Sequence, residues 1–198
     1  MTYNKIKYLI LHIIQSCKKD RKGVSLPKLY KILYFIDFGH YALFRQPVTD
    51  LEYLKFKHGP VPRGLRDYLT LLEDDELIEE KTLITDNNEQ TVYISHVFNS
   101  LENYAFTQDE ISTINRTITK CKNLDANDLS TETHYHYSWI STQNGELITY
   151  DKAQYCDFDA LEYYYEIDSN EYQQVQGKRK NFIENKDLSN LLAEIQTL

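Results

Sequence analysis

The sequence has few of the residues that mark specialised protein classes. Its 198 residues include three cysteines, four prolines and one tryptophan. The cysteines, Cys17, Cys121 and Cys156, lie far apart and form no CxxC pair. A disulfide framework and a thiol-rich zinc site are therefore disfavoured. We expect buried free thiols in a reducing compartment, which predicts a cytoplasmic protein.

Long apolar runs are also missing. Residues 1–14 are the first apolar stretch, but lysines interrupt it and it is too short to cross a bilayer. It has no small-residue cleavage site, so we expect neither a signal peptide nor a membrane partner.

Motifs for cofactors and catalysis are absent as well. The six glycines are scattered, and neither GxGxxG nor GxxxxGK[ST] occurs, which excludes the common phosphate loops. His134 and His136 would share a face on a strand, with Glu132 nearby, but zinc needs a further ligand. Ser138 lies close to both histidines without a nucleophile elbow. We predict a protein that is not an enzyme and that holds no metal or cofactor.

Charge is abundant and unevenly distributed. The 22 basic and 30 acidic residues give a formal net charge of −8. Residues 1–67 carry 13 basic and 5 acidic side chains, whereas residues 68–198 carry 9 and 25. This balance argues against a protein that coats duplex DNA, although a local basic patch stays open. The 17 tyrosines supply amphipathic area that suits a core or a protein-binding surface.

Hydrophobic periodicity predicts a mainly helical chain. The helix within 25–44 has a broad apolar face and should be the central core helix, with Ser25 as its N-cap. Thr107 should cap the helix that follows it, with Asp109 and Glu110 in its first turn. The expected helices cover residues 3–19, 25–44, 63–75, 107–122 and, as a short helix, 125–133.

Extended structure is predicted in three places. Residues 77–85 and 90–97 flank a polar turn and give the best hairpin signal. Residues 53–58 form a short extended segment, and Gly59-Pro60-Val61-Pro62 should then stop regular structure. A second possible hairpin runs from Trp139 to Ile148 through Asn144-Gly145.

These elements predict an α+β fold. We expect a mainly helical single domain over residues 1–150, with one or two small β-hairpins. Residues 151–198 form a second region, an acidic and tyrosine-rich helical appendage with 10 acidic and 5 basic residues. Its features are the run Tyr163-Tyr164-Tyr165 and an amphipathic segment through Leu188 and Ile195.

Two surfaces are candidates for binding. The first third of the chain gathers basic side chains in an order of elements compatible with a winged helix. They form either a DNA-binding face or the solvated sides of amphipathic helices, and the acidic remainder favours the second. The basic residues are Lys18, Lys19, Arg21, Lys22, Lys28, Lys31, Lys55, Lys57, Arg63 and Arg66.

The segment 53–66 is the second candidate surface. Tyr53, Lys57, His58, Arg63 and Arg66 lie around a proline-fixed corner, in which glycine permits a close backbone approach. This corner is either a docking surface for a partner or a fold-defining turn packed on the core helix.

Three segments resemble one known family. In the first segment, residues 28–35 read KLYKILYF and are followed by His40-Tyr41. In the second, residues 47–49 read PVT and are followed by Tyr53 and by HGPV at 58–61. In the third, Leu129-Ser130 is followed by Thr133-His134 and Trp139. Their order and spacing resemble the Panacea antitoxin domain, the SocA-like group, over roughly residues 5–150. The residues that carry the resemblance are Lys28, Leu29, Leu33, Tyr34, His40, Tyr41, Pro47, Tyr53, Gly59, Pro60, Val61, Thr133, His134 and Trp139.

The resemblance implies a bacterial or phage antitoxin of a two-gene module. Such proteins neutralise unrelated toxins, commonly by direct contact, and are not known for catalysis or a cofactor. Our first hypothesis is an antitoxin whose partner is a protein toxin encoded by a neighbouring gene. Its expected contacts are the corner at 53–66 and, in the appendage, Glu162, Tyr163, Tyr164, Tyr165 and Glu166.

Two alternatives stay open. One is a winged-helix-like DNA-binding transcriptional regulator, with its own operon as one target. The other is a protease adaptor for a bound partner. The sequence does not predict an oligomeric state.

Overall fold

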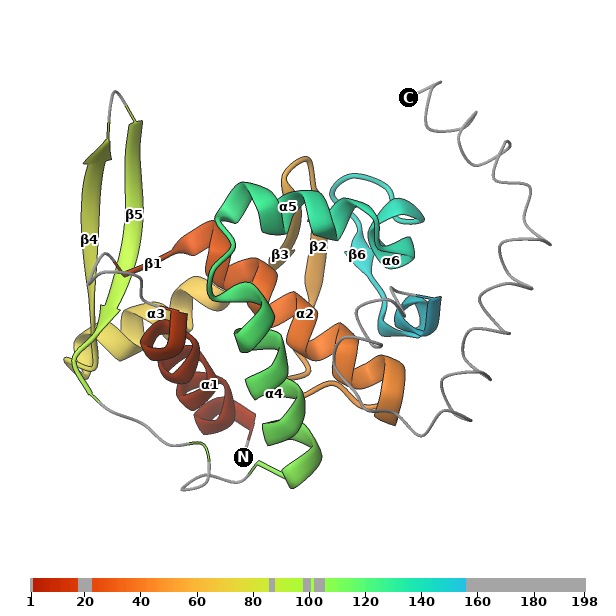
Figure 1. Ribbon diagram of the computed structural model, residues 1–198, viewed down its shortest axis with the longest axis horizontal. Helices are drawn as coiled ribbons and strands as arrows, with labels where there is room; N and C mark the ends of the chain where they lie inside the picture. The colour runs from red at the N-terminus through yellow and green to blue at the C-terminus, as the bar shows by residue number, and fades with distance from the viewer. Residues whose placement is uncertain (1, 18–22, 86–87, 98–100, 102–105, 156–198) are drawn as a thin grey trace. The chain divides into compact units, whose positions relative to one another are not determined.

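A computed structural model describes residues 2–17, 23–85, 88–97, 101 and 106–155. Helix α2 (Leu26–Phe44) is the centre of this part of the chain and contacts α4, α5 and β3 (Figure 1). It has ten buried residues, among them Leu29, Ile32, Leu33 and Ile36. The prediction of a central core helix is confirmed, and Ser25 stands at its N-cap.

The other helices surround α2 and complete the core. Helix α1 (Thr2–Cys17) buries Leu9, Ile10, Ile13 and Ile14, as its periodicity predicts. The remaining helices are α3 (Leu65–Asp74), α4 (Gln108–Cys121), α5 (Ala126–His134) and α6 (Tyr137–Ile140), followed by the 3₁₀ helix η2 (Tyr150–Tyr155).

Capping boxes fix the starts of α4 and α5. The Thr107 hydroxyl accepts the N–H of Glu110, and the Glu110 carboxylate accepts the N–H of Thr107. Asp125 and Asp128 form the same reciprocal pair at α5. These pairs satisfy N–H groups that the first helical turn leaves without a partner, which is why the predicted starts are correct.

The first small sheet contains the predicted hairpin. Strands β4 (Ile78–Thr85) and β5 (Asn88–Ser95) are antiparallel, and the short β1 (Val24–Ser25) pairs with β5. The hairpin is therefore confirmed, although β5 begins two residues earlier than predicted. Thr85 pairs with Asn88, and residues 86–87 lie outside the described part.

The second small sheet corrects one prediction. Residues 59–62 do not stop regular structure, because they form β3 (Gly59–Pro62), which pairs with β2 (Tyr53–Phe56). The strand order β3-β2-β6 makes β3 an edge. The Arg63 N–H donates to the Glu52 carbonyl, so the alternating ladder places Pro60 and Pro62 at positions that need no N–H donor.

The second hairpin is also wrong in its pairing. Trp139 and Ile140 end the short helix α6, and β6 (Leu147–Ile148) pairs with β2 instead. Asn144-Gly145 precedes β6, and Gly145 has the positive φ of 84° that favours a glycine in a turn. The predicted turn at Asn144-Gly145 is therefore correct, but the segment before it is a helix and not the expected strand.

The α+β, mainly helical fold is confirmed, and its sheets are small and antiparallel. Cys17 and Cys121 are free and buried, and burial raises their pKa to about 11 and about 12, respectively. Such thiols are protonated at neutral pH and poorly reactive. None of the described helices is long and apolar enough to span a bilayer. Cys156 and the rest of the predicted appendage from there on lie outside the described residues, whereas residues 151–155 of the appendage belong to η2.

Candidate functional site

Residues far apart in the sequence meet at Gly59. Its φ is 101°, and a Cβ atom there would lie 2.6 Å from Lys31 Cε and 2.6 Å from Thr133 Oγ1. The Thr133 hydroxyl is itself held by donating to the Ser130 carbonyl at 2.7 Å. Strand β3 can approach α2 and α5 this closely only because residue 59 has no side chain.

Lys31 lies under this contact and is 2% exposed. Its Nζ donates to the carbonyl oxygen of Pro60 at 3.3 Å. Among the described residues, no carboxylate forms an ion pair with it. Burial lowers its pKa from 10.5 to about 8, so the ammonium carries a desolvation cost that one long hydrogen bond offsets only in part.

Replacing Lys31 with methionine should therefore stabilise the fold at pH 7. Methionine keeps the volume and removes the buried charge, and we expect a gain of about 1–2 kcal/mol in the free energy of unfolding by denaturant titration. The gain should shrink as the pH rises from about 8 to 10.5, because the wild type then releases the proton on folding and gains stability.

Lys28 is the matched control for Lys31. Its Nζ donates to the carbonyl oxygens of Lys122 and Leu124 at 2.8 and 2.7 Å, beyond the end of α4. Lys28→Met should lose about 1 kcal/mol. Equal effects of the two substitutions would contradict the assignment of a desolvation cost to Lys31.

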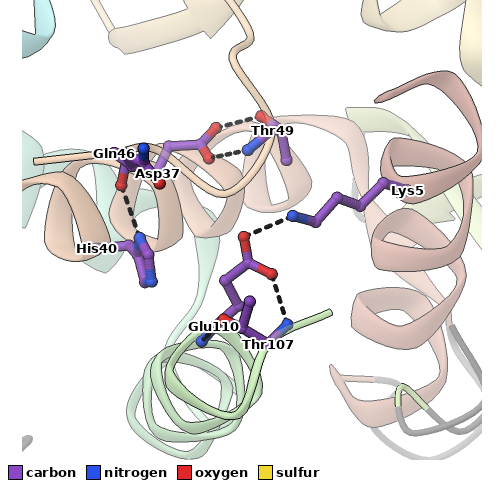
Figure 2. Close-up of polar contacts among 7 residues, drawn as sticks. All are labelled: Lys5, Asp37, His40, Gln46, Thr49, Thr107 and Glu110. Carbon is purple, nitrogen blue, oxygen red and sulfur yellow. Dashed lines mark hydrogen bonds and ion pairs between the residues drawn. The ribbon is translucent and has the colours of Figure 1, made fainter. Parts of the chain in front are cut away.

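A second ionisable group is buried on α2 at Asp37, which has no exposed surface. Its Oδ1 accepts the Thr49 N–H at 2.8 Å, and its Oδ2 accepts the hydroxyls of Thr49 at 2.5 Å and Tyr53 at 2.6 Å. Figure 2 shows the two hydrogen bonds that join Thr49 to Asp37 of α2. Burial raises the pKa of Asp37 from 3.8 to about 6, and the hydrogen bonds oppose that rise.

Asp37 is not among the residues predicted from the sequence. The available signal was a carboxylate directly after Ile36 on the apolar face of a core helix, with Thr49 and Tyr53 in a neighbouring motif. Tyr53 is fully buried, so the prediction that its side chain contacts a partner is wrong. Its ring lies edge-on to Tyr34 and its hydroxyl is committed to Asp37.

The histidines and the serine of the predicted cluster are divided between two short helices. His134 ends α5, whereas His136 is the N-cap of α6, so the two share no strand. Ser138 is fully buried and shares a 2.5 Å hydrogen bond with the Tyr34 hydroxyl. In the described part of the chain, no group of three metal-ligating side chains comes together.

His134 instead belongs to an aromatic and cationic cluster. Its ring stacks on Trp139 with the centroids 4.1 Å apart, and Lys55 Nζ lies 4.0 Å from the Trp139 ring centroid. Burial, together with the positive charges of Lys31, His58 and Lys55, lowers the pKa of His134. The β2–β3 turn therefore lies in a positive local field.

Comparison with known families matches residues 29–140, more than half of the chain, to the sequence model described as "Antitoxin SocA-like, Panacea domain". The chain belongs to this family. No curated protein and no solved structure matches it. The resemblance inferred from the three motifs is confirmed.

The motif residues of the Panacea domain are mostly structural supports. Leu29, Leu33 and Tyr34 have no exposed surface. His40 Nδ1–H donates to the Gln46 carbonyl at 2.6 Å and so fixes the chain before Pro47 (Figure 2). Tyr41 stacks on Tyr150, with their ring centroids 5.5 Å apart. These contacts join α2 to the segment that leads into β2 and to η2.

The predicted basic face of the Panacea domain is only partly accessible. Lys31 is buried, so it belongs neither to a DNA-binding face nor to a solvated helix side. Lys28 is half-buried, and its Nζ donates to two carbonyl oxygens. Arg63 pairs with Glu52 at 3.1 Å, and Arg66 approaches Glu80 at 3.9 Å. Lys18, Lys19, Arg21 and Lys22 lie outside the described residues.

Four of the predicted contact residues remain available at the corner. Lys57, His58, Arg63 and Arg66 are exposed, and their role in binding stays a prediction. The predicted contacts of the appendage, Glu162, Tyr163, Tyr164, Tyr165 and Glu166, lie outside the described residues.

Proposed function

We propose that this protein is the antitoxin of a bacterial or phage toxin–antitoxin module and that it neutralises a protein toxin in the cytoplasm by direct binding. The observation that carries the proposal is the family match over residues 29–140. A family of antitoxins implies a toxin as partner. Binding without catalysis also suits a fold in which Asp37 and Ser138 are buried and hydrogen-bonded to neighbouring side chains.

We also propose a division of labour along the chain. Residues 1–150 form the scaffold, and residues 151–198 help to select the toxin. The appendage combines 10 acidic and 5 basic residues with three consecutive tyrosines. Acidic charge steers association with a basic surface, and tyrosines are common anchors at interfaces.

Co-expression with the neighbouring gene tests the proposal. Induction of that gene alone should stop growth, and co-expression of this protein should restore it, with the two products purifying as one complex. Replacing Tyr163, Tyr164 and Tyr165 with serine in the full chain should weaken protection if the appendage contacts the toxin.

Two results would contradict the proposal. One is a neighbouring gene that is harmless when induced alone. The other is toxicity that persists although this protein is present and folded. A shortened half-life of the toxin in the presence of this protein would point to delivery to a protease, rather than to sequestration.

A further inference from the structure

The outward face of the β3-β2-β6 sheet is apolar. Paired residues of antiparallel strands share a face, and successive residues alternate. Tyr53 points toward Asp37 of α2, so its neighbours in the strand, Leu54 and Phe56, lie on the opposite face. Val61 and Leu147 both pair with Leu54 and share that face. We name Leu54, Phe56, Val61 and Leu147 the apolar sheet face.

Two members of this face are exposed. Phe56 and Leu147 are each 42% exposed, while Leu54 and Val61 are half-buried. Phe56 pairs with Gly59 across the strands. A side chain at position 59 would point toward Lys31 and Thr133 instead, so this position does not cover the Phe56 ring. A contiguous apolar patch on a soluble surface commonly marks an interaction site.

Charged groups border the apolar sheet face at both ends. Glu52 and Arg63 form an exposed ion pair, 3.1 Å apart, at the start of β2. At the other end, Lys57 and His58 are exposed in the β2–β3 turn, and neither forms an ion pair with another described residue. The positive charges of Lys31, Lys55 and His58 already act together on His134. This end therefore favours a partner that brings negative charge.

We propose that the apolar sheet face is the docking site for the protein toxin. The inference rests on the proposed function and adds the chemistry of the contact. The toxin contributes an apolar segment that packs on Phe56 and Leu147, and a carboxylate of that segment lies beside Lys57 and His58. An apolar centre with a charged rim has the composition of a binding hot spot.

A second copy of this chain fits the face less well than a toxin. If two copies packed these faces together with the β2–β3 turns side by side, Lys57 and His58 of one copy would lie against the same basic residues of the other. If the copies packed in the opposite direction, Lys57 and His58 would lie against the ion pair of Glu52 and Arg63.

Substitutions on the apolar sheet face test the inference in the full-length protein. Phe56→Asp and Leu147→Asp should each raise the dissociation constant for the purified product of the neighbouring gene by roughly 30-fold or more. Lys57→Glu should slow association by about tenfold at low salt, with a smaller effect at high salt.

Ile84→Asp is the matched control, because Ile84 is a 77% exposed aliphatic residue on β4. It should bind the toxin as the wild type does. Circular dichroism melting identifies any variant that fails to fold, and Phe56→Ser then replaces Phe56→Asp as the milder test.

The outcomes separate the inference from the proposed function. Wild-type affinity in Phe56→Asp, Phe56→Ser and Leu147→Asp, with toxin still neutralised, overturns the docking site alone. The docking site is also overturned if these variants change a dimer to a monomer and still bind toxin. A wild type that neither binds nor protects overturns the proposed function and the docking site together.

Discussion

Replacing Gly59 with alanine should lower the free energy of unfolding by about 3 kcal/mol. A non-glycine residue at a φ of 101° costs about 1–2 kcal/mol in backbone strain. The new methyl group would also lie 2.6 Å from Lys31 Cε and Thr133 Oγ1, both of which are buried, so overpacking adds about 1–3 kcal/mol. Chemical denaturation with an unchanged m-value measures the loss.

Other glycines of this chain separate the two contributions. Gly145 has a φ of 84° with nothing within 4 Å of its Cβ position, so Gly145→Ala should cost only about 1 kcal/mol. Gly39 lies inside α2 with open space around it, and Gly39→Ala should stabilise the helix by about 0.5–1 kcal/mol. The double variant Gly59→Ala/Lys31→Ala should be more stable than the sum of the two single effects predicts, because it removes one of the clashing atoms. A cost for Gly59→Ala no larger than that for Gly145→Ala would contradict the close approach of β3 to α2.

The helices and the long hairpin were predictable because local physics determines them. The apolar positions of α1 and α2 recur at helical spacing, and Thr107 and Asp125 supply side chains that cap the following helix. The strands β4 and β5 flank a polar turn. None of these features depends on residues far away in the sequence.

The elements that were mispredicted depend on long-range pairing. Local sequence treats the prolines at 60 and 62 as breakers, but β3 tolerates them because it is an edge strand whose partner is β2. Likewise, β6 has only two residues and forms by pairing with β2. The segment expected to be its hairpin partner, before Asn144, forms the helix α6 instead. Periodicity over so few residues carries no signal for either choice.

The sequence predicted which corner side chains are exposed only in part. Lys57 and His58 are exposed in the corner at 53–66, and the role of this corner in binding stays a prediction. Tyr53, in contrast, is turned inward by a hydrogen bond to Asp37, a residue 16 positions earlier on another element. Lys31 was assigned to a basic face because charge in a sequence usually indicates exposure. Only the three-dimensional contacts show that α2 buries both a lysine and an aspartate.

Asp37 should be the most costly polar residue of this fold to remove. Asp37→Ala leaves the Thr49 N–H and the hydroxyls of Thr49 and Tyr53 without their acceptor in a site closed to water. An unsatisfied buried donor costs about 1–3 kcal/mol, so we expect a loss on the order of 4 kcal/mol by denaturant titration at pH 7. The same change should loosen the start of β2, which hydrogen exchange of the backbone at Tyr53 and Leu54 would detect.

Asp37→Asn isolates the charge of Asp37 from its hydrogen bonds. The amide oxygen can still accept the Thr49 N–H, and its NH₂ group can donate to the hydroxyl oxygens of Thr49 and Tyr53.

Because burial raises the pKa of Asp37 from 3.8 to about 6, the wild type gains stability from this group at low pH and loses it as the pH rises through 6. The difference in unfolding free energy, Asn variant minus wild type, should therefore increase by about 3 kcal/mol between pH 3.5 and pH 7. Other carboxylates titrate equally in both proteins and cancel in the difference. A difference that is flat over this range would show that the three donors fully offset the cost of burial and leave the pKa of Asp37 unshifted. A difference that falls as the pH rises would show that the donors stabilise the carboxylate more than burial destabilises it. In that case Asp37 would be a buried anion with charge-assisted hydrogen bonds to Thr49 and Tyr53.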